Sequence, residues 1–182
     1  FGVDRFFFGT DFPMWDHKEE LERFMLLPLS ETEREALLHK NIEKMLFFGS
    51  IGAALCYAVA VFSGVPIVGL ISCAFTGFCV SMLWPGSLIL ASDRFPNGGV
   101  LIFALMAAGG DLGASFGPQL VGIVTDFAIG NAQILELAAR LGLSGEQIGM
   151  KLGLLIGSLF PIIAIPVYAY FRKKDKLKEK QK

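Results

Sequence analysis

The order of hydrophobic and polar residues divides the chain into a charged N-terminal segment, a long apolar region and a basic C-terminal end. The apolar region contains four runs, at residues 48–63, 66–91, 100–127 and 152–171. About 20 apolar residues cross the hydrocarbon core of a bilayer as a helix. The pattern therefore predicts a mainly α fold: a polytopic α-helical membrane protein with four transmembrane helices, spanning residues 48–171.

The third run, residues 100–127, contains a carboxylate, Asp111, near its middle. At about 1.5 Å per residue from Val100, Asp111 would lie roughly 16 Å deep, close to the bilayer centre. An acid at that depth costs several kcal/mol unless it is paired, hydrated or protonated. Asp111 is therefore predicted to be a transport or proton-coupling residue. The alternative is a structural acid that is hydrogen-bonded to the backbone or to a serine, or that faces water without coupling.

Other residues of the apolar region are candidates for lining a cavity. Ser81 and Trp84 lie near the Trp84-Pro85-Gly86 sequence, which is predicted to kink the second helix. Gln119 follows Gly117-Pro118 in the third. Each could face a substrate, although a membrane tryptophan more often packs against neighbours or anchors the interface.

Small residues in the third run predict close helix packing and bending. Gly113, Gly117 and Pro118 are interpreted as a packing and bending element, with an interruption of the helix at Gly117-Pro118.

The distribution of basic residues predicts the orientation. The tail, residues 172–182, is rich in lysine and should face the cytoplasm. Four crossings then place the N-terminus in the cytoplasm too, together with a turn at residues 92–99. In that turn Asp93 and Arg94 are predicted to form an ion pair or a gate contact. The connection at 128–151 would lie outside and form a short helix on the membrane surface.

The charged N-terminal segment, residues 1–47, predicts a small soluble unit of one strand and two helices. Residues 5–10 (RFFFGT) form a short apolar run typical of a buried strand, and Asp11 follows it. Asp16 with Glu19 predicts the start of a helix at residues 17–26. Ser30 with Glu33 predicts a second helix that ends near residue 46. A lone strand has no ladder partner, so this unit is expected to fold poorly.

Composition excludes several other classes of protein. The chain has 182 residues, of which 53% are hydrophobic, and a net charge of −1. The three cysteines lie inside apolar runs without metal-ligand spacing, so no metal site and no cofactor are expected. No recognisable signal peptide is expected, and no basic surface favours a nucleic acid.

The N-terminal residues resemble the C-terminal end of the amidohydrolase superfamily. The resemblance covers about residues 1–46 and rests on DRFFFGTDFPMW and EREALLHKNIEKML. It implies the closing unit of a (β/α) barrel, in which Asp11 serves a catalytic metal centre, such as zinc, and handles the proton of the attacking water. The family takes further metal ligands from histidines on earlier strands, and this chain has only His17 and His39. Catalysis and zinc binding are therefore expected only if the barrel were complete.

The apolar region resembles the last four helices of a major facilitator superfamily transporter. The resemblance covers about residues 48–175, through PIVGLISCAFTGFCVSMLWPGSLILASDRFPNGG and AAGGDLGASFGPQLVGIVTD. It implies a bacterial inner-membrane permease for a small solute, a sugar or a metabolite. Because such transporters have twelve helices, it also implies partner helices that this chain does not contain.

The two resemblances meet between Met45 and Gly49, so the sequence is predicted to be a composite chain or a fragment. A gene remnant, a recombination product and an assembly error each produce such a chain. Transmembrane transport as part of an incomplete permease is the favoured function. The alternative is an amidohydrolase-type hydrolase or decarboxylase fragment that is inactive alone. A third reading is that the chain has no independent function.

Overall fold

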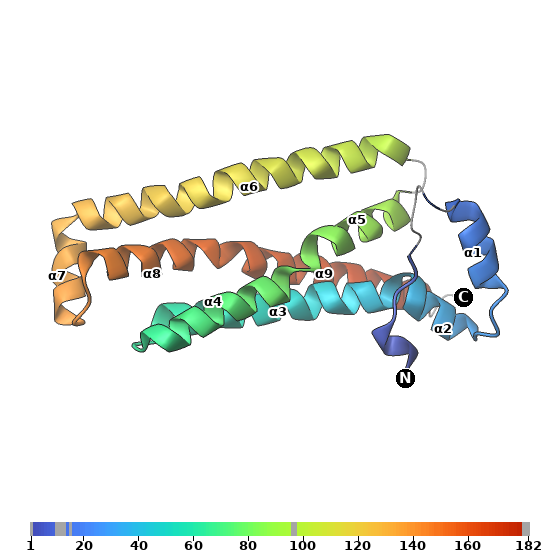
Figure 1. Ribbon diagram of the computed structural model, residues 1–182, viewed down its shortest axis with the longest axis horizontal. Helices are drawn as coiled ribbons and strands as arrows, with labels where there is room; N and C mark the ends of the chain where they lie inside the picture. The colour runs from blue at the N-terminus through green and yellow to red at the C-terminus, as the bar shows by residue number, and fades with distance from the viewer. Residues whose placement is uncertain (1, 10–13, 15, 96–97, 180–182) are drawn as a thin grey trace.

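A computed structural model of the chain describes residues 2–9, 14, 16–95 and 98–179 (Figure 1). These residues are mainly helical, as predicted. The helical elements in chain order are η1 (Val3–Arg5), α1 (His17–Met25), α2 (Glu31–Glu35), η2 (Ala36–Lys40), α3 (Asn41–Phe62), α4 (Pro66–Val80), α5 (Leu83–Arg94), α6 (Gly99–Gly130), α7 (Ala132–Arg140), α8 (Gly145–Gly157) and α9 (Leu159–Glu179).

Four helical stretches in the described residues are long and apolar enough to cross a membrane. They are Glu31–Phe62, Pro66–Ala91, Val100–Gly130 and Gly145–Lys173. Each contains most of one predicted transmembrane run. The prediction of four candidate spans is therefore confirmed by length and composition. In Figure 1, η1 and the end of α9 lie at the same end of the molecule.

The predicted N-terminal strand is wrong, because the described residues contain no strand. Val3–Arg5 is a short 3-10 helix, and residues 6–9 are irregular. A single apolar run cannot form a ladder without a second strand. This segment instead satisfies its backbone on a helix: the amide of Asn41 donates to the carbonyls of Val3 and Phe6, each at 2.9 Å. The backbone N–H of Phe8 donates to the carbonyl of Leu37 at 3.0 Å.

The two N-terminal helices begin where the capping signals predict. The Asp16 carboxylate accepts a hydrogen bond from the backbone N–H of Lys18 at 2.8 Å. Asp16 is therefore the N-cap of α1, which starts at His17. Ser30 and Glu33 form a complete capping box at the start of α2. From there α2, η2 and α3 follow one another without a break. The N-terminal segment and the first span therefore share one helix, Glu31–Phe62.

The second span is broken before its proline. α4 ends at Val80 and α5 begins at Leu83, so the direction changes at Ser81 and Met82, just ahead of the predicted kink. Pro85 has no backbone N–H to donate to the carbonyl four residues earlier, and its ring crowds that carbonyl. The carbonyl belongs to Ser81, which places the break there.

α6 continues through Pro118, so the predicted interruption at Gly117-Pro118 is wrong. One proline removes a single backbone hydrogen bond, and long helical segments on both sides retain theirs. α6 is also the least buried of the four candidate spans in the described residues. None of the residues in its most apolar window is fully buried. It meets α8 near its C-terminal end, where the Thr125 hydroxyl donates to the carbonyl of Gly149 at 3.2 Å.

The connection after α6 is helical, as predicted. α7 turns across the end of the bundle (Figure 1), and Ser144 and Gln147 form a capping box at the start of α8. At this end the Lys151 ammonium donates to the carbonyls of Val61 and Ser63, at 2.6 and 2.7 Å. These carbonyls lie at the C-terminal end of α3, where no further turn of helix can satisfy them.

The core lies at the other end of the bundle, between α3 and α5. Ile42, Leu46 and Leu90 form its buried cluster, with Tyr168 and Phe171 of α9 packed against it. A Cβ on Gly86 would lie 2.9 Å from Cδ2 of Leu46. Only glycine therefore allows α5 to approach α3 this closely.

We predict that Asn41→Ala releases the N-terminal segment without unfolding the bundle. Asn41 is 2% exposed, and its amide holds residues 3–6 through two hydrogen bonds. Limited trypsin digestion should cut after Arg5 faster in the variant than in the unmodified protein. The control Ser144→Ala removes a cap at the opposite end and should leave that cleavage rate unchanged. Equal cleavage after Arg5 in all three proteins would contradict the role of Asn41.

Candidate functional site

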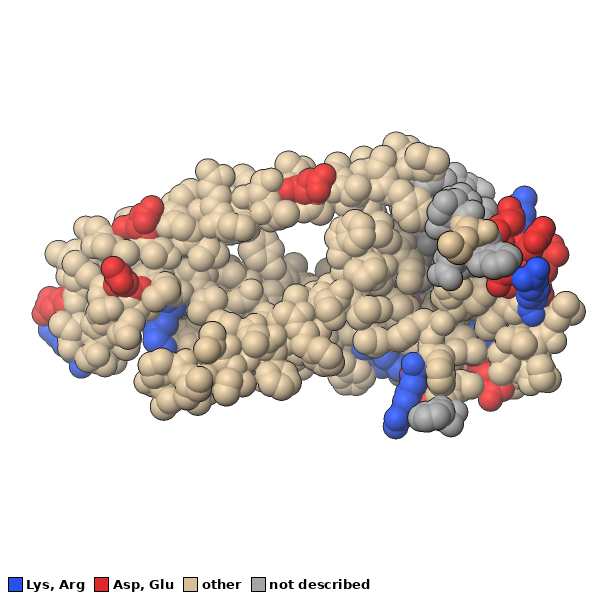
Figure 2. All heavy atoms as spheres, viewed as in Figure 1, with Lys and Arg blue, Asp and Glu red and all other residues tan. Residues whose placement is uncertain are grey.

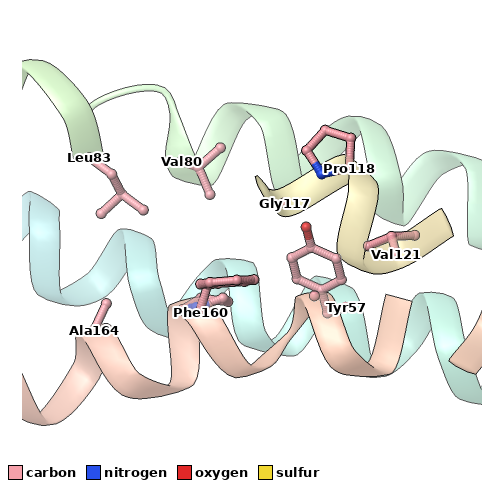
Figure 3. Close-up of a pocket in the computed structure, with 10 residues that line it drawn as sticks. Tyr57, Val80, Leu83, Gly117, Pro118, Val121, Phe160 and Ala164 are labelled. Carbon is pink, nitrogen blue, oxygen red and sulfur yellow. The ribbon is translucent and has the colours of Figure 1, made fainter. Parts of the chain in front are cut away.

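A cavity of about 450 Å³ lies inside the bundle, between residues of α3, α4, α5, α6, α8 and α9 (Figure 3). Its size is within the range of small-molecule sites. It opens beneath the middle of α6. The lining residues are mostly apolar: Tyr57, Val80, Leu83, Gly117, Pro118, Val121, Gly157, Phe160, Pro161 and Ala164.

Tyr57 is the residue of this cavity that sequence analysis missed. Among the lining residues, all in the described part of the chain, it alone has a polar side chain. Its ring rises from α3, and its hydroxyl points toward Gly117 and Pro118 of α6 (Figure 3). The signal in the sequence was a single tyrosine within the first apolar run. A phenol there supplies one donor and one acceptor to any molecule in the cavity.

Asp111 lies on the exposed surface of α6, about 9 Å along the helix axis from Gly117. Its carboxylate has no hydrogen bond or ion pair with any residue that the structure describes. The nearby Ser115 hydroxyl donates to the backbone carbonyl of Asp111 at 2.9 Å and not to its side-chain carboxylate. No serine of the described chain therefore satisfies this acid.

Trp84 packs against α6 beside Asp111. A Cβ on Gly110 would lie 2.7 Å from Nε1 of Trp84, so the indole edge touches the helix backbone there. The side chain is 53% exposed. Figure 2 shows an opening through the molecule between α6 and the helices facing it. Trp84 thus contacts α6 in a region where the chain leaves the helix largely uncovered.

Of the other residues predicted to line a cavity or to bend and pack α6, some line this cavity and others do not. Gly117 and Pro118 line the cavity. Ser81 and Gln119 do not: the Ser81 hydroxyl donates to the carbonyl of Phe78 at 2.8 Å, and Gln119 lies about 200° around α6 from Gly117. Gly113 has no described atom within 4 Å of where its Cβ would be. Its packing role therefore stays a prediction that needs a neighbour from elsewhere.

Arg94 forms an ion pair with Glu43 of α3, at 3.1 Å, which the sequence did not predict. The two side chains are 15% and 6% exposed. The Arg94 guanidinium also lies 5.2 Å from the centre of the Phe171 ring. α5 extends through Arg94, so the predicted turn begins later than residue 92. Asp93 lies in α5, but its side chain is outside the described part, and its contact with Arg94 stays a prediction.

The described residues contain no group of three or more His, Cys, Asp or Glu that could hold a metal. Asp11 lies outside the described residues, as does the side chain of His17. His39 lies in η2, within the long first helix.

Comparison with known proteins gives one match, at the N-terminus. Residues 1–48 match the amidohydrolase family model, which is 48 of the 182 residues. No curated protein and no solved structure matches the chain. The N-terminal resemblance to amidohydrolases is thus supported over the segment where it was predicted. The resemblance of residues 48–175 to transporters rests on the sequence motifs alone.

We predict that Glu43→Gln destabilises the bundle by about 3 kcal/mol, because it removes the carboxylate charge 3.1 Å from the nearly buried Arg94 guanidinium. The control is Glu136→Gln, which breaks an exposed pair with Arg140 (2.8 Å) and should change stability by less than about 1 kcal/mol. Thermal unfolding in detergent, followed by circular dichroism, measures both. Equal midpoint shifts in the two variants would show that the Glu43–Arg94 pair adds nothing.

Proposed function

We propose that this chain carries the last four helices of a major facilitator superfamily type permease and takes part in moving a small solute across a membrane. One observation carries the proposal: Asp111 stands unpaired on the exposed surface of a membrane-length helix, α6, which also lines a cavity of the bundle about 9 Å further along its axis. Four candidate spans and the transporter-like motifs agree with it.

The energetics of Asp111 support a partner beyond this chain. A carboxylate facing lipid near the bilayer centre is unfavourable by several kcal/mol. Polar groups at this depth normally face a bundle interior or a water-filled path. The exposed surface of α6 around Asp111 fits helices that complete the transporter. Such helices are the expected partners, and they would supply the water or hydrogen bond that Asp111 lacks.

The cavity supports a site for the solute. The Tyr57 hydroxyl would bind a polar atom of the solute. The small side of α6 at Gly117 and Pro118 would leave space for the solute opposite Tyr57. Trp84 of α5 contacts α6 at Gly110, the residue before Asp111. With so few polar groups from this chain, a sugar or another polar metabolite would depend on the missing helices for most of its hydrogen bonds.

The proposed location is a bacterial inner membrane with both termini in the cytoplasm. The basic tail after Phe171 supports this orientation through the preference of lysine and arginine for the cytoplasmic side. The positions of η1 and of the end of α9, at one end of the molecule, agree with it (Figure 1).

We predict that Asp111→Asn abolishes uptake driven by a pH gradient while leaving the chain folded. Membrane vesicles that contain the chain together with the helices that complete the transporter would be given an acidic exterior and a panel of radiolabelled hexoses and organic acids. Uptake should fall by about tenfold or more, because the amide cannot take up and release a proton at this depth. The matched control is Asp126→Asn, near the opposite end of α6. Uptake by Asp111→Asn equal to that of the unmodified chain would refute proton coupling through Asp111.

A second candidate function is a metal-dependent amidohydrolase-type reaction, favoured by the family match over residues 1–48. In that reading Asp11 would serve the metal centre. A zinc site takes three or four protein ligands, and the described residues gather no such set.

We predict that the purified chain binds no stoichiometric zinc. Metal analysis after dialysis against zinc, for the unmodified chain and for Asp11→Asn, measures this. Equal, trace zinc in both proteins is the expected result. About one zinc per chain that is lost in Asp11→Asn would instead favour the hydrolase. A chain with neither zinc nor uptake would match the third reading, no independent function.

A further inference from the structure

Lys151 and Arg172, the cations at the two ends of the last apolar run, are separated by about the thickness of a membrane's hydrocarbon core. Lys151 is fixed at the level of Ser63 by its hydrogen bond at 2.7 Å. Arg172 lies 21 residues later in the α8–α9 run, which at 1.5 Å per residue is about 32 Å. A bilayer's hydrocarbon core is about 30 Å thick. If Lys151 lies at one interface, Arg172 lies at the headgroup level of the other.

Arg172 is held in place by aromatic rings at that level. Its guanidinium lies 4.8 Å from the centre of the Phe47 ring and 5.4 Å from that of Phe48. Stacking on two rings restrains the flexible side chain and lowers the entropy lost when an anion binds. A pocket of about 270 Å³ opens here, lined by Phe47, Ala169, Arg172 and Lys173. It therefore combines two positive charges with an apolar floor.

The surroundings of this pocket are complementary to a phospholipid, with cations for the headgroup and an apolar stripe for an acyl chain. Phe48, Leu55 and Phe62 recur every seven residues on α3 and are 59%, 62% and 79% exposed. Seven residues are nearly two full turns, so these side chains form one stripe that leads from the pocket toward the other membrane face. Arg94, the nearby cation of α5, is already compensated by Glu43. The positive charge offered at the pocket is that of Arg172 and Lys173.

We propose that this pocket binds one anionic phospholipid, with its phosphate between Arg172 and Lys173 and an acyl chain along the Phe48–Leu55–Phe62 stripe. Basic pockets at the ends of membrane helices are suited to anionic headgroups. A free phosphate would satisfy the cations and leave the stripe uncovered, so the lipid is the better match. The proposal needs the chain to be in a membrane and does not depend on transport.

Binding is tested by native mass spectrometry of the full chain in detergent with phosphatidylglycerol, and with phosphatidylcholine as the neutral lipid. We expect one phosphatidylglycerol to be retained in preference to phosphatidylcholine. The double variant Arg172→Gln/Lys173→Gln should bind phosphatidylglycerol about 30-fold more weakly, since each cation at an anionic surface contributes about fivefold. The matched control Lys18→Gln/Arg140→Gln removes the same two charges from α1 and α7 and should retain wild-type binding.

A second variant separates a defined site from general attraction between charges. Phe47→Leu keeps every charge and an apolar side chain but removes one ring from under Arg172, and it should weaken binding about threefold. The proposal is overturned if both double variants lose the lipid equally, or if Phe47→Leu binds as the unmodified chain does. It is also overturned if inorganic phosphate displaces phosphatidylglycerol fully, because the acyl chain would then contribute nothing.

Discussion

The ion pair between Glu43 and Arg94 is the contact on which the arrangement of the bundle depends. It joins α3 to α5 at 3.1 Å, with both side chains nearly buried. A pair so desolvated contributes little by itself, yet neither partner can be removed without leaving a buried charge. It therefore selects one register of α5 on α3, the register in which Gly86 meets Leu46. Phe171 of α9 covers the guanidinium, so the same pair also sets the position of the last helix.

This contact bears on the relation between the two parts of the sequence. Glu43 lies within the segment that matches the amidohydrolase family, and Arg94 lies in the apolar region that follows it. The helix Glu31–Phe62 passes through residue 48 without a break. The two parts are thus joined by a buried ion pair and by a continuous helix, which a flexible linker would not produce. Whatever its origin, the junction at residues 45–49 is in the middle of a packed structural element.

The sequence predicted those features of the fold that depend on local chemistry. Apolar length marked the four candidate spans, and Asp16 with Glu19 and Ser30 with Glu33 marked two helix starts. Features set by distant residues were missed. Residues 5–10 have the composition of a strand, but only the fold shows that the side-chain amide of Asn41, 35 positions further along the chain, donates to the backbone carbonyl of Phe6.

The residues of the candidate site also divide into those that the local sequence reveals and those that only the fold brings together. Asp111 was found because a charge stands out in an apolar run, whereas Tyr57 matters only because the fold brings it opposite Gly117 and Pro118. The pairing of Glu43 with Arg94 spans 51 positions, and a local pattern offered Asp93 as the nearer choice. One of the two proline predictions failed: Pro85 accompanies a helix break, as predicted, whereas Pro118 does not interrupt α6. The difference is that α6 has long helical segments on both sides.

The four spans are unequally covered, and this inequality supports an assembly larger than the chain. α3 holds the core residues Ile42 and Leu46, while the most apolar part of α6 contains no fully buried residue. Exposed leucine and phenylalanine would be satisfied by lipid, so their exposure alone does not require a partner. The Asp111 carboxylate is different, because lipid tails offer it neither a hydrogen bond nor water. The side of α6 that carries Asp111 is therefore where a partner helix or a water-filled path has most to contribute.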